Sequence, residues 1–243
     1  MKPFLFLGTR AEDAAADDEY AAVLRCADLD EPGLRRVRLE RDELGTVDLD
    51  DWSGILLGGG PFNVSDPEQA KSAVQRRVEA ELADVARQAV AADFPFFGAC
   101  YGIGVLGSLP GGLVDRTYGE PIGCVEVTLA EEGRRDPLFD GMPDAFSVFL
   151  GHKEAVTRLP DGAVALASST ACPVQAFRIG RNVYATQFHP ELDIGGLCLR
   201  VDVYRDYGYF EPEQARDLQD MARRSVVTEP PALLANFVGR YAR

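Results

Sequence analysis

A cysteine flanked by glycines, directly after a short apolar run, is the feature that most constrains this chain. Residues 94–97 (Phe-Pro-Phe-Phe) have the composition of a buried strand, and residues 98–102 (Gly-Ala-Cys-Tyr-Gly) follow at once. The glycines permit a sharp strand-to-helix turn, which lifts the side chain at its apex above the end of a sheet. The N-terminal end of the next helix favours the thiolate, the nucleophilic form of cysteine. The pattern therefore predicts that Cys100 is a nucleophile.

Strand-like and helix-like segments alternate around this elbow. Apolar strand patterns are followed by helical patterns in the first half of the chain, and short strands set close together fill residues 123–188. This order is typical of an α/β fold with a mostly parallel sheet and helices on both faces, extended by antiparallel strands. Ser65 or Asp66 is expected to cap a helix that runs to about Ala91, with Pro67 at its first position.

The last fifty residues differ in character and predict a helical extension. We therefore divide the chain into a domain over residues 1–192 and an extension over residues 193–243 that packs on it. The extension carries an aromatic cluster, which is expected to pack against the main domain; a surface for an oligomer or partner is the alternative. The cluster consists of Tyr204, Tyr207, Tyr209 and Phe210.

Charge and cysteine content exclude several classes of function. The formal net charge is −14 and the isoelectric point about 4.6, the wrong sign for binding nucleic acid or an anionic membrane. No apolar stretch approaches the roughly 18 residues of a membrane span. The five cysteines include no Cys-x-x-Cys pair, which argues against a zinc ribbon and favours reduced thiols in a cytoplasm. The four besides Cys100 are assigned to packing.

A base for the thiol is easy to choose, because the chain has two histidines. His189 lies in residues 187–191 (Gln-Phe-His-Pro-Glu), with Glu191 two positions later. On extended backbone, residues i and i+2 point the same way, so Glu191 can hold one ring nitrogen while the other faces the thiol. Cys100, His189 and Glu191 are thus the predicted triad of an acyl-transfer site.

Such a site also needs donors for the oxyanion that forms on the attacked carbonyl, and backbone N–H groups usually supply them. Tyr101, directly after the nucleophile, is one candidate. The other is the loop of residues 58–61 (Gly-Gly-Gly-Pro), which follows a strand. A glycine loop can also bind phosphate, but this one has neither of the two glycine-rich phosphate motifs.

Taken together, these motifs resemble the class I glutamine amidotransferases, of the stand-alone, GMP-synthase-like kind. The matching segments are residues 57–61, 98–102 and 187–191, with weaker matches at 119–123 and 151–156 (Gly-His-Lys-Glu-Ala-Val). The resemblance implies a flavodoxin-like three-layer sandwich and hydrolysis of the glutamine side-chain amide through a glutamyl thioester. It implies Gly59 and Tyr101 as oxyanion donors, and neither a cofactor nor a metal.

The substrate-binding residues are also implied by the resemblance, and two of them depart from the family pattern. Most relatives have a glutamine that holds the substrate where this chain has Gly104, and a serine where it has Gly151. Gly60, Gly104, Gly151 and His152 are the expected substrate contacts. The departures leave a γ-glutamyl compound or a peptide-like amide open as the substrate in place of free glutamine.

Several readings of the function therefore stand side by side. The main one is a glutamine amidohydrolase that passes ammonia to a separate synthetase or works alone, as a monomer or a homo-oligomer. The alternatives are a γ-glutamyl hydrolase or peptidase, and a catalytically silent regulatory module of the same fold. A protease or chaperone of a related sandwich fold fits less well, because such relatives place the acid elsewhere and lack the His-Pro-Glu ending.

Overall fold

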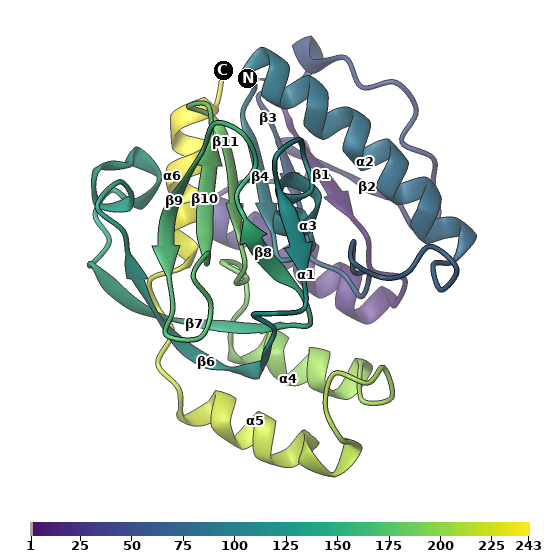
Figure 1. Ribbon diagram of the computed structural model, residues 1–243, viewed down its shortest axis with the longest axis vertical. Coiled ribbons are helices and arrows are strands. Elements are labelled where there is room, and N and C mark those ends of the chain that lie inside the picture. Colours follow the sequence, from purple (N-terminus) through teal and green to yellow (C-terminus); the bar gives the residue numbers. More distant parts are fainter. Residues whose placement is uncertain (1) are drawn as a thin grey trace.

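The computed structural model describes residues 2–243, and a nine-stranded sheet runs through it (Figure 1). Five neighbouring strands are parallel, as the alternation of strands and helices predicts. The other four are antiparallel and continue the sheet on one side. In spatial order they are β2 (Leu34–Arg38), β1 (Phe4–Gly8), β3 (Gly54–Leu57), β4 (Phe96–Ala99), β11 (Val183–Thr186), β10 (Ala176–Ile179), β9 (Ala163–Ser168), β6 (Glu120–Leu129) and β7 (Ala145–His152).

Helices cover both faces of the parallel strands, which confirms the three-layer α/β prediction. Two hydrophobic cores separate the layers, one on each face of the sheet. The first is closed by α1 (Asp13–Ala27) and α6 (Pro231–Tyr241), and the second by α2 (Ala73–Ala92) and α3 (Tyr101–Gly107). Parallel strands buried on both faces need this double cover, because their side chains are apolar on both sides.

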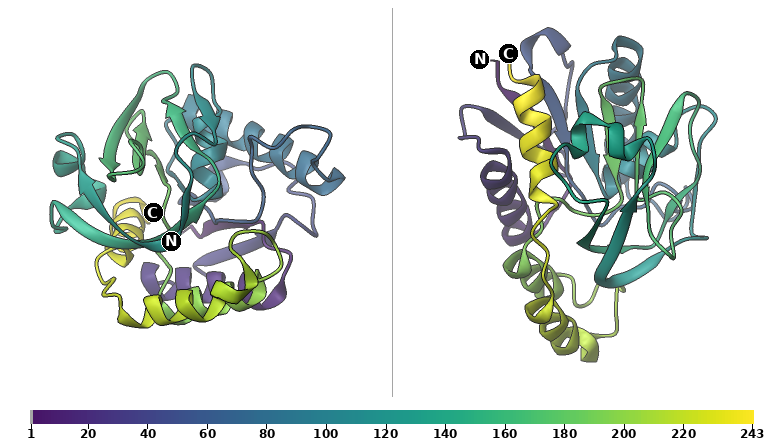
Figure 2. Two further views of the ribbon diagram at one scale, coloured as in Figure 1. Left: turned by 60° about the horizontal axis from the view of Figure 1, so that its bottom comes forward. Right: turned by 90° about the vertical axis from the view of Figure 1, so that its left-hand side faces the viewer.

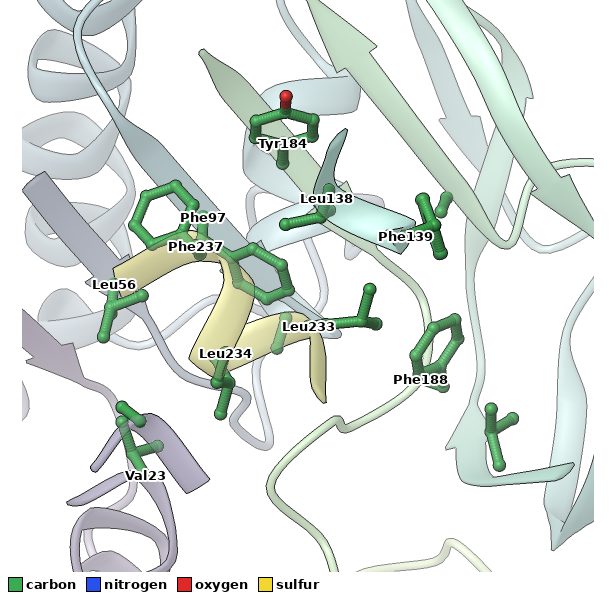
Figure 3. Packing of buried hydrophobic residues seen from close by; sticks show 14 of the residues in the cluster. Val23, Leu56, Phe97, Leu138, Phe139, Tyr184, Phe188, Leu233, Leu234 and Phe237 are labelled. Atoms are coloured by element: carbon green, nitrogen blue, oxygen red, sulfur yellow. The ribbon is translucent and has the colours of Figure 1, made fainter. Parts of the chain in front are cut away.

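Phe237 of α6 lies at the centre of the first core (Figure 3). Its ring centroid is 5.6 Å from that of Phe97 and 6.4 Å from that of Tyr184, in edge-to-face arrangements that aromatic rings favour. Phe237 is fully buried, and burying a side chain of this size contributes about 1.5–3 kcal/mol. The last helix therefore belongs to the main core, and the backbone N–H of Lys2 donates to the carbonyl of Arg243.

The other helices of the C-terminal segment pack at a different place. The helices α4 (Ile194–Val203) and α5 (Ala215–Arg224) contact one another and lie against β6 and β7, at the bottom of Figure 1 and along one side in Figure 2. A third apolar cluster around Phe149 holds them there. The helical character expected for residues 193–243 is confirmed, whereas the domain boundary at residue 192 stays a prediction.

The start of α2 was predicted at the wrong place. The helix begins after Ser72, whose hydroxyl accepts a hydrogen bond from Gln75 N–H, and not after Ser65 or Asp66. The reason is a tertiary contact: the N–H groups of Val64 and Ser65 donate to the carboxylate of Glu154, which fixes this stretch as a loop. A small second sheet of β5 (Leu113–Asp115) and β8 (Ala155–Arg158) also had no counterpart in the prediction.

The sheet places the predicted triad at one point. β4 and β11 are neighbouring parallel strands, with Ala99 beside Thr186. Their carboxyl ends therefore bring Cys100 and the segment after Thr186 together, at the end of an open α/β sheet where ligands usually bind. Within residues 2–243, no helix combines the length and the apolar character needed to cross a membrane.

Candidate active site

Cys100 occupies a strained turn between β4 and α3. Its backbone has φ 51° and ψ −92°. Residues other than glycine rarely adopt this conformation, and strained backbone of this kind is typical of functional sites. Its N–H donates to the carbonyl of Thr186 at 2.8 Å, which ties the elbow to β11. The elbow needs glycine at position 98, because a Cβ there would lie 2.9 Å from the Cα of Gly102.

His189 and Glu191 lie beside this elbow in the arrangement that their spacing predicts. His189 Nδ1 is 2.8 Å from Glu191 Oε1, and both side chains are buried. The Cys100 side chain lines the same cavity as this ring, and its charge favours the protonated imidazole. In the protonated ring, Nδ1–H donates to this carboxylate, which leaves Nε2 for the thiol. Arg200 Nη1 lies 3.1 Å from the same Nδ1.

The charges around His189 stabilise its imidazolium form. Burial by itself disfavours that form, but the charges of Glu191 and Cys100 outweigh both burial and the nearby Arg200, and raise the pKa of His189 to about 9. Burial also disfavours the ionised form of Glu191, but His189 and Arg200 hold the pKa of this carboxyl well below its usual range. Glu191 therefore stays ionised opposite the ring.

A buried layer of charges behind this pair was missed from the sequence. Arg200 of α4 donates to Glu191 Oε1 at 2.8 Å and lies 3.6 Å from Glu19 Oε1. Glu19 of α1 also accepts from Arg10 Nε at 3.0 Å, and all three side chains are buried. Acids and arginines on helices usually form solvated faces, so no sequence signal distinguishes Glu19; an arginine within the apolar α4 is the one available hint.

The glycine loop contacts both this layer and the histidine. The N–H of Gly59 donates to Glu19 Oε1 at 3.2 Å, so this N–H is occupied by a carboxylate. A Cβ at Gly59 would lie 2.3 Å from His189 Cε1, which restricts the position to glycine. Gly60, the next residue, lines the cavity that contains Cys100. A side chain there is excluded as well, because its Cβ would lie 2.0 Å from Thr9 Oγ1.

One cavity, which we call the site cavity, joins most of the predicted site residues. Its walls are mainly apolar, and its polar side chains include Arg10, Asn63, Lys153, Glu154, Gln187 and Arg200. Gly59, Gly104 and Glu191 do not line it; Glu191 lies behind the ring of His189, to which it is bonded. The predicted residues that do line it are Cys100, His189, Tyr101, Gly60, Gly151 and His152.

Gly104 faces the carboxylate of Glu154 rather than open space. A Cβ at this position would lie 2.9 Å from Glu154 Oε1 and 3.3 Å from a methyl group of Val64. Glu154 is 7% exposed, and burial raises the pKa of its carboxyl. The Glu154 carboxylate thus fills the space beside Gly104. Glu154 also lines the site cavity, although the sequence did not predict it as a substrate contact.

His152 uses both of its ring nitrogens inside the protein. Nδ1 is 2.8 Å from the backbone oxygen of Glu154, and Nε2 is 3.0 Å from a carboxylate oxygen of Glu120. It therefore holds the β7–β8 turn in place while one side of its ring faces the site cavity. Gly151 is restricted to glycine, since a Cβ would lie 2.6 Å from Ile122 Cγ1.

Two groups of side chains within residues 2–243 bring three metal-ligand atoms within 4.8 Å of one another. They are Glu19, His189 and Glu191, and Glu120, His152 and Cys172. In each group the histidine is hydrogen-bonded to a carboxylate of the same group, and Cys172 Sγ donates to the carbonyl of Val174. Hydrogen bonds inside the protein thus account for both clusters.

Comparison with known proteins agrees with this geometry. Residues 33–196, most of the chain, match the family described as glutamine amidotransferase class-I. Over 153 residues the chain is 33% identical to a subunit of the glutamine-hydrolyzing GMP synthase of Methanoregula boonei, covering 60% of this chain and 70% of that protein. It is 32% identical over 141 residues to the glutamine-hydrolyzing GMP synthase of Streptomyces avermitilis, covering 58% of this chain but 24% of that longer protein.

Solved structures extend the likeness to nearly the whole fold. A glutamine amidotransferase from Thermotoga maritima superposes with a TM-score of 0.77 at 20% identity, covering 99% of this chain and 98% of that one. One from Methylobacillus flagellatus gives 0.74 at 19% identity, covering 99% and 94%. These likenesses support the flavodoxin-like sandwich, and the family match covers the elbow, the glycine loop and the histidine segment. The chain therefore belongs to the class I glutamine amidotransferases, a family of enzymes.

Proposed function

We propose that the chain hydrolyses the side-chain amide of glutamine to glutamate and ammonia through Cys100, His189 and Glu191. The observation that carries the proposal is the buried hydrogen bond between His189 and Glu191, with Cys100 lining the same cavity as His189. A silent module would have no need to hold a cysteine in a strained turn against a buried, charge-stabilised histidine.

The first half of the reaction forms a thioester. The Cys100 sulfur attacks the amide carbon, and the carbonyl oxygen takes the negative charge. We assign its donors to the N–H groups of Tyr101 and Gly60, rather than Tyr101 and Gly59, because the N–H of Gly59 donates to Glu19. Each such donor contributes about 2.7–4 kcal/mol to lowering the barrier. His189 protonates the departing nitrogen, the C–N bond breaks and ammonia leaves.

The second half reverses the proton flow. His189, now neutral, takes a proton from a water molecule, whose oxygen attacks the thioester carbon. The C–S bond breaks, glutamate leaves and the thiolate–imidazolium pair is restored. Glu191 remains ionised throughout and stabilises the imidazolium, while Arg200 holds the Glu191 carboxylate in place. The whole cycle consumes one water per glutamine.

The test is release of ammonia and glutamate from glutamine by the purified chain. We expect both products in equal amounts from the wild type and none above background from Cys100→Ala. Cys198→Ala, a substitution at a cysteine on α4 outside the site cavity, is the control and should keep full activity. If the wild type releases nothing from glutamine or from any γ-glutamyl amide, the amidohydrolase proposal is wrong. That result would support the alternative of a catalytically silent regulatory module.

Delivery of ammonia to a separate synthetase is a further part of the proposal, supported by relatives whose names designate them as one subunit of a GMP synthase. A γ-glutamyl hydrolase that works alone is the second candidate, favoured by the pairing of Gly104 with Glu154. Steady release of glutamate from γ-glutamyl conjugates by the isolated chain, together with the substituted amine, would support the second candidate. Turnover that rises only with an added ammonia-dependent synthetase would support the first.

A further inference from the structure

The site cavity does not end at the catalytic residues. A second hollow opens at the surface between the start of β6 and the α5 region, and the two share Ile122 and Tyr209 in their walls. We call it the surface hollow; its other lining residues are Pro121, Phe210, Gln214, Asp217 and Leu218. Ile122 and Tyr209 therefore adjoin both hollows, which places the surface hollow next to the site cavity.

Tyr209 belongs to the C-terminal segment yet lines the site cavity together with Cys100. Burial raises the pKa of its phenol, and the Cys100 charge adds to the effect. Lys153 Nζ lies 4.3 Å from the centre of its ring, a cation–π contact that fixes the ring. Two members of the aromatic cluster, Tyr204 and Tyr209, are thus part of the site-cavity lining.

The wall near His189 combines Arg200 with a group of apolar side chains. Leu192, Leu197 and Val201 line the site cavity, and all three belong to the cluster that holds α4 and α5 on the sheet. His189 must face the nitrogen that it protonates, so these apolar side chains are available to the leaving group. Bare ammonia makes no use of them, whereas a hydrocarbon substituent on the nitrogen gains by burying its apolar surface there.

The polar groups lie where an amino-acid head would be recognised. Lys153 carries a positive charge and Glu154 a carboxylate, and both line the site cavity. A γ-glutamyl group ends in an α-ammonium and an α-carboxylate, and these two side chains complement its charges. The surface hollow is mixed: Pro121, Phe210 and Leu218 are apolar, Gln214 and Asp217 are polar, and the charge of Asp217 disfavours a second carboxylate.

Building on the proposed function, we infer that the preferred substrate is a γ-glutamyl amide of an apolar amine, whose amine part passes Ile122 and Tyr209 into the surface hollow. The chemistry is that of glutamine hydrolysis with a substituted nitrogen: the sulfur attacks the γ-carbonyl carbon, His189 protonates the amine nitrogen, and the C–N bond breaks. Water then cleaves the thioester. The products are glutamate and a free primary amine, and no oxidant or cofactor takes part.

A substrate series tests the inference directly. Glutamine, γ-glutamyl-butylamine, γ-glutamyl-phenethylamine and γ-glutamyl-phenylalanine differ in the substituent on the nitrogen, and glutamate release is common to all. We expect kcat/KM for γ-glutamyl-phenethylamine to exceed that for glutamine at least tenfold. The γ-glutamyl-phenylalanine peptide, which adds a carboxylate, should fall at least tenfold below γ-glutamyl-phenethylamine. If glutamine is cleaved as well as the conjugates or better, this inference is wrong while the amidohydrolase proposal stands.

Variants separate the surface hollow from the catalytic centre. Leu218→Trp fills the hollow and Phe210→Ala removes an apolar wall, so each should lower the ratio of kcat/KM for γ-glutamyl-phenethylamine to that for glutamine about fivefold or more. The control is Val226→Trp at a residue that is 75% exposed on the segment between α5 and α6, where the ratio should not change. Circular dichroism confirms the fold of each variant. Unchanged ratios in both hollow variants would overturn the inference.

Discussion

The carboxylate of Glu154 takes the space that a side chain at position 104 would need. Its Oε1 lies 2.9 Å from the place of a Cβ on Gly104, and the same oxygen accepts the N–H of Val64 at 2.9 Å. The absence of a side chain at position 104 and the buried position of Glu154 therefore depend on each other. Where the resemblance implies a neutral amide, this chain presents a carboxylate on a neighbouring turn, which changes the charge that the substrate meets.

This arrangement predicts a specific incompatibility. Gly104→Gln forces its side chain against Glu154 and Val64, and overpacking of this kind typically costs about 1–3 kcal/mol. The same substitution should cost less in a Glu154→Ala background, because the obstacle is gone. Urea unfolding of the two single variants and the double variant measures the coupling, which we expect to exceed about 0.5 kcal/mol.

The control is another helical glycine with open space around it. No atom lies within 4 Å of a Cβ at Gly239 of α6, so Gly239→Gln should stabilise the protein by up to about 1 kcal/mol through helix propensity. Equal effects of glutamine at positions 104 and 239, or simple additivity between Gly104→Gln and Glu154→Ala, would show that Glu154 does not exclude a side chain at 104.

Local patterns in the sequence predicted the elbow, the sheet type and the His189–Glu191 contact. Each of these depends on residues that are neighbours in the chain: glycines around Cys100, apolar runs before turns, and an acid two positions after a histidine. The helical character of the C-terminal segment was also predicted correctly, and its last helix begins at Pro231, a residue that helices favour at the first position. These local patterns predict the structure correctly because the conformation that the local sequence prefers is also the one that the tertiary structure requires.

The parts that the sequence did not reveal depend on residues that meet only in the folded protein. Arg10 and Glu19 lie near the N-terminus and Arg200 lies about 180 residues later, and each has the sequence pattern of an ordinary surface charge. The start of α2 was misplaced because Glu154, some ninety residues away, captures the N–H groups of Val64 and Ser65. The capping pattern at Ser65 therefore does not start a helix, because the long-range hydrogen bonds to Glu154 hold this stretch as a loop.

Removing the charge of Glu191 should change the titration of His189. Glu191 is the partner that raises the pKa of His189 most, so in Glu191→Gln that pKa should fall from about 9 by more than one unit. With the imidazolium less stable, kcat/KM for glutamine should fall roughly 10²-fold or more. The chain has two histidines, so NMR of the imidazole protons resolves both.

Glu120→Gln provides the matched control for this titration. It removes the carboxylate that faces His152 Nε2, and the pKa of His189 should stay where it is. If Glu191→Gln leaves the titration of His189 unchanged, the carboxylate does not support the imidazolium and its place in the triad is wrong.

Stability should depend on pH through the same pair. The pKa of His189 is higher in the folded state than the ordinary 6.5, so its contribution is complete below pH 6.5 and is lost as pH rises toward 9. The full difference is on the order of 3 kcal/mol at 1.36 kcal/mol per pKa unit. Glu191 has a lowered pKa, so its contribution is present above about pH 4.5 and is lost on acidification.

Urea unfolding at pH 6 and pH 9 measures this effect. The wild type should lose stability between the two values, and His189→Gln should lose much less. A wild type that is equally stable at both values, or a His189→Gln variant with the same loss, would contradict the assignment of the alkaline transition to this residue.

Glu19 should matter for stability and for catalysis at once. Glu19→Ala leaves Arg10 and Arg200 facing a buried gap, and breaking buried ion pairs in this way costs about 3–5 kcal/mol. Glu19→Gln keeps an oxygen for the N–H of Gly59 and should cost less. Glu19→Ala should reduce kcat, because the glycine loop and Arg200 lose a common anchor, and Glu19→Gln should reduce it less.

Asp17, on the same helix and paired with Arg36 at the surface, is the comparison for Glu19. Asp17→Ala should change stability by less than about 1 kcal/mol and leave kcat unaltered. Thermal unfolding and steady-state glutaminase assays on the three variants decide the matter. A Glu19→Ala protein as stable and active as Asp17→Ala would mean that the buried charge layer has no role in positioning the site.

The strain at Cys100 predicts that a substitution which destroys activity stabilises the fold. At φ 51° and ψ −92°, any residue with a Cβ is held in an unfavourable conformation that costs on the order of 1–3 kcal/mol, and glycine escapes this cost. Cys100→Gly should therefore be more stable than Cys100→Ala by about 1 kcal/mol, although both are inactive. At the neighbouring Ala99 of β4 the backbone is that of an ordinary strand, so Ala99→Gly should destabilise. Urea unfolding of the three variants compares them. A Cys100→Gly protein less stable than Cys100→Ala would show that the elbow stores no strain, and that the nucleophile is held by packing alone.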